Sequence, residues 1–323
     1  MGRFFELDPG KIKTYAASDR VSKVRTALQA VPPQKGMSVR DFLKGLPGIL
    51  KAKDLLDVAR NISEASRNCK PVIAMLGGHV IKCGCAPVLL GLAKKGFISS
   101  FASNGAAAIH DAELAAWGRT SEDVAAQLED GSFGMASDTA EILNSAAKRA
   151  CELQEGLGES LGELLEERQY PFREYSLAAG SLRIQIPYSV HVAIGTDIVH
   201  QHPDADGAAI GEASLRDFRI FAAVVSQLGD GGVVLNLGSA VIMPEVFLKA
   251  LSLARNLGHP VRNFTTVNMD MIQHYRPTVN VVQRPVLAGG RGYSLTGHHE
   301  IMIPLLAAAV CELSEEQGQG LTS

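Results

Sequence analysis

Short, mostly apolar runs alternate with longer stretches of helical periodicity along most of the chain. The runs VIAML (72–76), FISSFA (97–102), SVHVAI (189–194), VVLNL (233–237) and VRNFTTV (261–267) predict buried strands. These runs do not switch regularly between apolar and polar residues, so both faces of each strand are expected to be covered. The pattern therefore predicts an α/β fold, with a mainly parallel sheet and helices on both of its faces.

The segment that precedes Pro71 is predicted to form a helical N-terminal extension over 1–70, packed on the core. Residues 17–29 and 51–67 carry apolar side chains at helical spacing. Ser38 can cap a further helix over 39–47, because Asp41 stands at the third position after it.

The remainder is predicted as an α/β nucleotide-binding core over 71–315 and a loose tail over 316–323. Glycines interrupt the helical pattern of 137–167, which can therefore be two helices. The segment 168–188 is interpreted as a connector and 198–212 as a loop. Further helices are predicted near 85–95, 106–117, 121–129, 213–228 and 301–314.

The composition narrows the class of protein. The chain has 323 residues, of which 46% are hydrophobic, and its net charge is −3. Without a basic surplus, and with only 6% aromatic residues, it has no electrostatic or stacking basis for binding nucleic acid. Residues 1–10 lack a secretory apolar run, and no run is long enough for a membrane span. Five cysteines are too few for a disulfide framework, so we expect a cytoplasmic protein with free thiols.

Small or polar residues follow each predicted strand, and ligands of open parallel sheets bind beyond the carboxyl ends of the strands. Small residues let a ligand approach the backbone closely, although glycine after a strand is also ordinary turn chemistry. The chain has no GxGxxG motif after a strand and no P-loop. The candidate binding residues at these ends are Gly77, Gly78, Ser103, Asn104, Gly105, Thr196, Asp197, Gly238, Ser239, Thr265 and Thr266.

The stretch SNGAAAIHDAE (103–113) leaves two explanations open. The small residues can allow a helix to pack closely on the sheet, or they can make room for a ligand. The pair His110-Asp111 follows them, and a histidine can transfer protons near neutral pH. Alternatively, His110 lies on a solvated helix face.

The run from Val72 to Gly118, with GGHVIKCG and SNGAAAIHDAELAAWG, resembles the nucleotide-binding core of the deoxyhypusine synthase-like superfamily. The wording NGAAAIHDAE (104–113) is closer to the C-terminal domain of bifunctional lysine-oxoglutarate reductase/saccharopine dehydrogenase enzymes, some of which are ornithine cyclodeaminases. Later segments resemble the synthase in order and spacing, namely GTD (195–197), LRDFRIF (215–221), NLGSAVI (236–242), TTVNMD (265–270) and IPLLAAAV (303–310).

The resemblance implies a Rossmann-like fold that binds NAD at these strand ends, and a homo-oligomer, dimer or tetramer, with sites between subunits. It implies that Asp111 contacts NAD. Deoxyhypusine synthase carries its aminobutyl group on a lysine near the C-terminus, whereas this chain has no lysine after Lys249. An imine requires a primary amine, so the chain is not expected to be a true deoxyhypusine synthase.

Further candidates lie in NMDMIQHYRP (268–277), which follows the predicted strand over 261–267. Asp270 and His274 are candidate catalytic residues together with His110, and Arg276 could hold a substrate carboxylate. Arg284 and Arg291 compete for that role. Asp197 and Asp270 could also bind ribose hydroxyls or a cationic amine.

Other constellations remain open. His200, His202 and Glu300 could serve a metal-dependent hydrolase, although HPDADG is also an ordinary acidic loop. His79, Cys83 and Cys85 are explained more simply by helix packing. Lys82 could meet a phosphate or be solvated.

The sequence therefore predicts an NAD-dependent enzyme that acts on a small amine or amino acid by transient hydride transfer, leading to deamination, cyclisation or amine transfer. The alternatives are the metal-dependent hydrolase and a non-catalytic nucleotide-binding member of the fold. No metal, nucleic acid or membrane partner is predicted for the preferred function.

Overall fold

A six-stranded sheet, with every strand parallel to its neighbours, forms the centre of the computed structural model, which describes residues 3–315. The strand order is β3-β2-β1-β4-β5-β6. The predicted α/β fold with a parallel sheet is confirmed. The strands are β1 (Val72–Leu76), β2 (Ser100–Asn104), β3 (Tyr188–His191), β4 (Val233–Leu237), β5 (Phe264–Asp270) and β6 (Gly290–Thr296).

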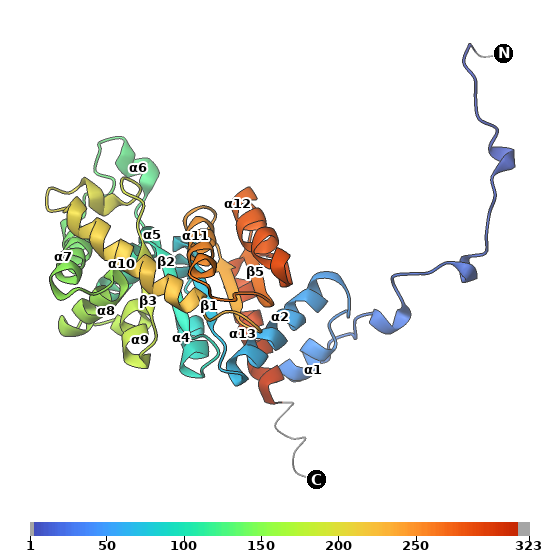
Figure 1. Ribbon diagram of the computed structural model, residues 1–323, viewed down its shortest axis with the longest axis horizontal. Coiled ribbons are helices and arrows are strands. Elements are labelled where there is room, and N and C mark those ends of the chain that lie inside the picture. Colours follow the sequence, from blue (N-terminus) through green and yellow to red (C-terminus); the bar gives the residue numbers. More distant parts are fainter. Residues whose placement is uncertain (1–2, 316–323) are drawn as a thin grey trace, which may run out of the picture.

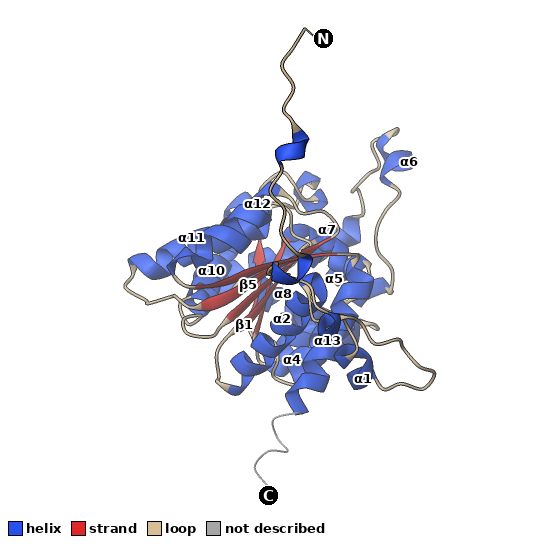
Figure 2. Cartoon of the chain, turned by 90° about the vertical axis from the view of Figure 1, so that its right-hand side faces the viewer, coloured by secondary structure: helices blue, strands red, loops and turns tan. Residues whose placement is uncertain are grey.

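Helices cover both faces of this sheet, as Figure 2 shows with the red strands between blue helices. In β1, Val72, Ala74 and Leu76 face one apolar cluster, and Ile73 and Met75 face the other. The first cluster includes α2 (Leu50–Arg67), α4 (Ala86–Lys94), α5 (Gly105–Trp117) and α13 (His299–Glu315). The second includes α10 (Gly207–Val225) and α11 (Ile242–Asn256). Burial on both faces explains why the strand sequences do not alternate.

The remaining helices lie around this centre (Figure 1). The helices α8 (Leu157–Glu167) and α9 (Leu177–Ile184) contact β3, and α7 (Ser137–Leu153) packs on α8. The shorter helices are α1 (Val39–Lys44), α3 (Gly78–Lys82), α6 (Val124–Leu128) and α12 (Tyr275–Pro277). Among the described residues, no helix combines the length and the apolar character that a membrane span requires.

The expected helix over 17–29 is not formed. Only two single turns occur there, Ala17–Asp19 and Thr26–Leu28, and every residue from 3 to 27 is exposed. This segment leads away from the body of the protein (Figure 1). Helices gain most of their stability from packing an apolar face, and this segment has no surface to pack on. The division at residue 70 stays a prediction, and the tail predicted over 316–323 lies outside the described residues.

The cap predicted at Ser38 is formed, because its Oγ accepts a hydrogen bond from the Asp41 N–H at 3.1 Å. The pattern over 137–167 is indeed two helices, α7 and α8. The connector expected over 168–188 contains α9, and α10 begins at Gly207, inside the expected loop over 198–212.

The last two strands of the sheet order, β5 and β6, differ from the prediction. β5 runs three residues beyond the predicted strand, and Thr265 pairs with Val233 at the first residue of β4. Thr265 and Thr266 therefore lie at the amino end of β5, opposite the edge predicted to bind a ligand. β6 was not predicted, because an edge strand with the sequence GRGYSLT needs no apolar run.

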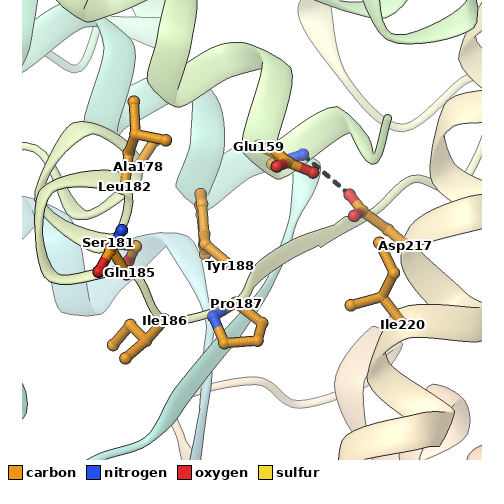
Figure 3. A pocket seen from close by; sticks show the side chains of 11 residues that line it. Glu159, Ala178, Ser181, Leu182, Gln185, Ile186, Pro187, Tyr188, Asp217 and Ile220 are labelled. Atoms are coloured by element: carbon orange, nitrogen blue, oxygen red, sulfur yellow. Dashed lines mark hydrogen bonds between the residues drawn. The ribbon is translucent and has the colours of Figure 1, made fainter. Parts of the chain in front are cut away.

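Asp217 of α10 joins the start of α8 to β3. Its Oδ2 accepts hydrogen bonds from the N–H groups of Gly158, at 2.9 Å, and Val190, at 2.7 Å; the dashed line in Figure 3 marks the first. A Cβ on Gly158 would lie 2.0 Å from the Tyr188 carbonyl oxygen, so only glycine lets α8 begin this close to β3. Burial raises the pKa of Asp217 to about 7, against the lowering effect of its backbone donors.

This raised pKa predicts a pH-dependent stability. The folded state keeps a proton on Asp217 that the unfolded chain releases near pH 4, so the free energy of unfolding falls as the pH rises from about 4 to 7. One such proton gives a slope of roughly 1.4 kcal/mol per pH unit. Asp217→Asn keeps an acceptor oxygen but cannot ionise, and urea unfolding at several pH values should show a shallower decline. Asp138→Asn, at an exposed acid, is the control; equal slopes for Asp217→Asn and wild type would contradict the prediction.

Candidate functional site

The carboxyl ends of β1 and β4 meet through their backbones. The Gly77 N–H donates a hydrogen bond to the Leu237 carbonyl oxygen at 3.0 Å, and a Cβ on Gly77 would lie 2.2 Å from the Gly238 carbonyl oxygen. No side chain fits between these two strand ends. The glycines predicted to receive a ligand thus serve first to bring two strands together.

The small residues of α5 also pack closely. A Cβ on Gly105 would lie 1.9 Å from Oδ2 of Asp197, so this carboxylate occupies the space beside the first turn of α5. A Cβ on Gly78 would lie 3.2 Å from the His110 ring. Asn104 caps α5 by accepting a hydrogen bond from the Ala107 N–H at 3.1 Å. In this structure, close packing accounts for Gly78 and Gly105.

His110 belongs to a chain of three polar side chains. Its Nδ1 lies 2.7 Å from the Thr120 hydroxyl, and that hydroxyl donates a hydrogen bond to Oε2 of Glu113. Oε1 of Glu113 accepts a second hydrogen bond from Thr139 at 3.0 Å. Burial alone would raise the pKa of Glu113, but His110, Thr120 and Thr139 together hold it below its usual value. Glu113 is therefore a buried carboxylate that stays ionised.

The direction of these bonds fixes the neutral form of His110. Thr120 has one hydroxyl proton, which goes to Glu113, so its oxygen must accept from the Nδ1–H of His110. The other ring nitrogen, Nε2, is then unprotonated in the neutral ring, and it has no hydrogen-bond partner among the described residues. A histidine held in this tautomer can accept a proton from a ligand.

His110 lines a cavity of about 210 Å³ at the carboxyl edge of the sheet. Lys82, Glu122, Thr196 and Asp197 lie around the same cavity. The pKa of Asp197 lies above its usual value, because the effect of burial outweighs the opposing effect of His200. The cavity thus combines an imidazole, an ammonium group and carboxylates, and it unites four residues that the sequence analysis discussed, His110, Lys82, Thr196 and Asp197. Thr120 and Glu113, which orient His110, were not selected from the sequence; Glu113 is the final residue of the NGAAAIHDAE stretch.

Two predicted cofactor-binding residues are engaged in the protein interior. The carboxylate of Asp111 is 1% exposed and accepts hydrogen bonds from the Ser176 hydroxyl and from the N–H groups of Leu177 and Ala178, so it caps the start of α9. Burial raises its pKa to about 6 despite these bonds. The Ser103 hydroxyl lies 2.7 Å from that of Tyr188. We therefore leave both residues out of the site proposed below.

The remaining predicted residues divide between two places. Ser239 follows β4 and Asp270 is the last residue of β5, both at the carboxyl edge; the Ser239 hydroxyl accepts a hydrogen bond from the Met243 N–H of α11 at 3.2 Å. His274 and Arg276 are exposed near α12, and Arg276 lies 3.5 Å from Glu245. Neither of these two lines the cavity of His110.

The predicted metal ligands have separate partners. Nδ1 of His200 accepts a hydrogen bond from the Gly195 N–H at 3.2 Å, and Nε2 of His202 lies 2.8 Å from the Gly134 carbonyl oxygen. Within residues 3–315, no three His, Cys, Asp or Glu side chains are arranged to hold a metal ion. The geometry gives the hydrolase hypothesis no support.

A larger cavity, of about 410 Å³, lies away from this edge, between α8, α9 and α10 (Figure 3). It is lined by Leu182, Pro187 and Ile220 on its apolar side and includes the structural carboxylate of Asp217. Pro187 precedes β3, which puts this cavity at the amino ends of the strands. Ligands of this fold class bind at the opposite edge, so the smaller cavity is the candidate site.

No family model matches the chain, and no curated protein matches it in sequence. Solved structures match its fold. A conserved LOR/SDH protein from Methanococcus maripaludis superposes with a TM-score of 0.50 at 18% identity, over 82% of this chain and 71% of that one. A protein assigned as a deoxyhypusine synthase, from Entamoeba histolytica, gives 0.51 at 11% identity, over 87% and 95%.

AgrE, in a ternary complex with ornithine and NAD+, superposes with a TM-score of 0.51 at 14% identity, over 81% of this chain. The chain spans about a third of the length of AgrE. The resemblance to the deoxyhypusine synthase-like superfamily is thereby confirmed as a shared fold.

The polar chain of His110 predicts a specific effect of Thr120→Val. Valine keeps the shape of threonine but removes the hydroxyl, so Glu113 loses a donor and Nδ1 of His110 loses its acceptor. We expect the free energy of unfolding to fall by about 1–3 kcal/mol. Nitrogen-15 NMR of the ring should show Nε2 unprotonated in the neutral wild type and a mixture of tautomers in the variant. Thr120→Ser keeps the hydroxyl and should resemble wild type; a protonated Nε2 in the neutral wild type would refute the assignment.

Proposed function

We propose that this protein is an NAD-dependent enzyme that acts on a small amine or amino acid in the cavity of His110. The observation that carries the proposal is the oriented imidazole of His110, held by Thr120 and Glu113, in a cavity that also contains Lys82 and Asp197. Such a cavity at the carboxyl edge of a parallel sheet matches the location of ligand sites in this class of fold.

The strand order supports a dinucleotide as cofactor. The order β3-β2-β1-β4-β5-β6 is the one found in dinucleotide-binding sheets, whose ligand lies where the strand order reverses, here between β1 and β4. The AgrE complex with NAD+ has a similar fold and adds support at the level of architecture.

The residues where the strand order reverses are suited to the phosphates of the cofactor. The turn Gly238–Val241 contains only small or apolar residues and leads into α11, whose N-cap residue Val241 makes no side-chain cap. A helix N-terminus favours a phosphate through its N–H groups; here Ser239 already accepts the N–H of Met243 and Pro244 has none, so the N–H of Ile242 is the first-turn donor left for a phosphate. The corresponding place on α5 is filled by Asp197. The cavity of about 210 Å³ is smaller than the roughly 300–1,000 Å³ of ordinary ligand sites, so most of a dinucleotide would lie outside it, along the open edge.

NAD, when bound, would supply the acceptor and donor of a hydride. The chain's own residues would orient the substrate and move its protons. Nε2 of His110 would take a proton from the substrate amine, and the ionised Glu113 would stabilise the charged ring through Thr120. Asp197 and Glu122 would attract a substrate ammonium group, and Lys82 a carboxylate. Because no lysine follows Lys249, we do not propose the covalent transfer step of deoxyhypusine synthase.

The homo-oligomer expected from the resemblance forms part of this proposal. Exposed apolar side chains follow several strands at the carboxyl edge, namely Ile194, Val241, Ile272 and Ile301. Apolar side chains gathered along one edge favour association with another protein surface. A second copy of the chain would cover them and narrow the open edge.

The phosphate position predicts a charge effect at Ala240, in the turn before α11. Ala240→Glu would set a negative charge beside the cofactor phosphates, and we expect NAD to bind at least tenfold more weakly, or about 1.4 kcal/mol. Ala240→Gln has the same size without the charge and is the matched control. An acid near a helix N-terminus does not destabilise the helix, so folding should be retained.

Binding is measured by calorimetry and by thermal unfolding, where NAD at about a hundred times its dissociation constant adds roughly 2.7 kcal/mol of stability to the wild type. If Ala240→Glu and Ala240→Gln bind NAD with equal affinity, the cofactor phosphates do not lie beside the start of α11. If NAD leaves wild-type unfolding unchanged, the cofactor assignment itself is wrong.

A further inference from the structure

His299, the first residue of α13, is buried at the carboxyl edge of the sheet with an incomplete set of contacts. It is 1% exposed, and neither Nδ1 nor Nε2 has a hydrogen-bond partner. A buried imidazole with two unpaired nitrogens loses its hydration without compensation. Because buried polar groups in folded proteins are normally paired, an unpaired one calls for a specific explanation.

The surroundings of the ring are polar on one side and tightly packed on the other. Nε2 lies 3.9 Å from Oδ1 of Asp270, which is too far for a hydrogen bond. A Cβ on Gly238 would lie 2.8 Å from both Cε1 and Nε2, so the ring rests directly on the turn after β4. The exposed His79, which follows β1, meets the ring edge-on at a centroid distance of 5.7 Å.

These contacts place the ring at the reversal of the strand order. Gly238 directly follows β4, His79 lies in α3 after β1, and Asp270 is the last residue of β5. Asn236 of β4 bonds to the Ser239 carbonyl oxygen of the same turn at 2.9 Å, and its own Oδ1 is also buried and unpaired. Three unpaired buried polar atoms thus belong to two residues that contact the turn Gly238–Ser239.

The charges around His299 restrict what could complete its bonds. Burial lowers the pKa of His299, although Asp270, Glu300 and the Met269 carbonyl oppose that effect. His79 contributes further lowering. A neutral imidazole has one donor and one acceptor nitrogen, which point in different directions, and a hydroxyl group can bond to either one of them. The carboxylate of Asp270 would repel an anion at the same position, whereas it can accept a hydrogen bond from a hydroxyl. A metal is not supported, because His299 belongs to no metal-binding group in the described part of the chain.

We propose that His299 and Asp270 form a binding site for a sugar hydroxyl, with the imidazole bonded to a ribose of the cofactor where the strand order reverses. The inference rests on the proposed function. It adds to that function a binding residue near the ends of β4 and β5, whereas His110 lies on α5, which follows β2. Nε2–H of His299 would donate a hydrogen bond to the hydroxyl oxygen, and the hydroxyl would donate to the carboxylate of Asp270, which lies 3.9 Å from Nε2.

The test compares His299→Phe with His298→Phe, its exposed neighbour in the chain. Phenylalanine fills the space of the ring and removes both unpaired nitrogens. For His299→Phe we expect an unchanged or higher denaturant midpoint without ligand, and a dissociation constant for NAD raised at least tenfold. His298→Phe should change neither quantity. His299→Gln retains a donor and an acceptor and should recover part of the affinity.

A ligand-free midpoint that falls in His299→Phe, with the NAD affinity unchanged, would show that the ring is paired within the folded protein and would overturn the inference. An unchanged affinity with an unchanged midpoint would overturn it as well. If wild-type protein does not bind NAD at all, the proposed function fails separately. Adenosine then serves as the probe, and the absence of an adenosine-induced nitrogen-15 shift at His299 would remove the sugar site too.

Discussion

The backbone contact between Gly77 and Gly238 is the constraint from which the geometry of this edge follows. Because β1 and β4 end together, with no space for a Cβ between them, the turns that follow must diverge to opposite sides. One leads to α3 and the other to α11. Gly78 then allows α3 to approach the ring of His110 on α5, which fixes where that histidine stands. The close packing of these glycines therefore also sets the position of the His110 ring.

Buried carboxylates serve two different purposes in this molecule. Asp111 accepts hydrogen bonds from N–H groups at the start of α9, and Asp217 accepts them from the start of α8 and from β3, so both join elements far apart in the sequence. Asp197 and Asp270 stand at strand ends beside space or beside an unpaired group. Hydrogen bonds within the protein engage both oxygens of Asp111 and Oδ2 of Asp217, whereas Oδ1 of Asp217 is buried without a partner. The second pair lies at the carboxyl edge of the sheet, where ligands of this class of fold bind, and that is why the proposals include Asp197 and Asp270.

Two histidines lie at the carboxyl edge of the sheet, and they differ in their hydrogen bonding. His110 is oriented by Thr120 and a carboxylate that remains ionised, and the residue lines a cavity. His299 is enclosed and unpaired, and its carboxylate neighbour is just beyond bonding distance. Oriented polar groups at fixed positions cost no reorganisation when a ligand arrives. A proton-transfer group on one side and a binding group on the other would together hold a substrate against a cofactor.

The sequence by itself determined the class of fold, because unbroken apolar runs between helical stretches have few solutions other than a covered parallel sheet. It also predicted that small and polar residues gather at one edge, and it left open whether His110 belongs to that edge or to a solvated helix face. It could not determine that Asp111 faces α9 rather than a ligand, since both roles need the same residue at the same spacing. Thr120 and Glu113 could be linked to His110 only by folding, because the link depends on how a loop returns to its helix. β6 and the exposed segment 3–27 likewise depended on which surfaces the rest of the chain leaves available. Local periodicity records what a segment can bury, whereas the tertiary structure decides whether there is anything to bury it against.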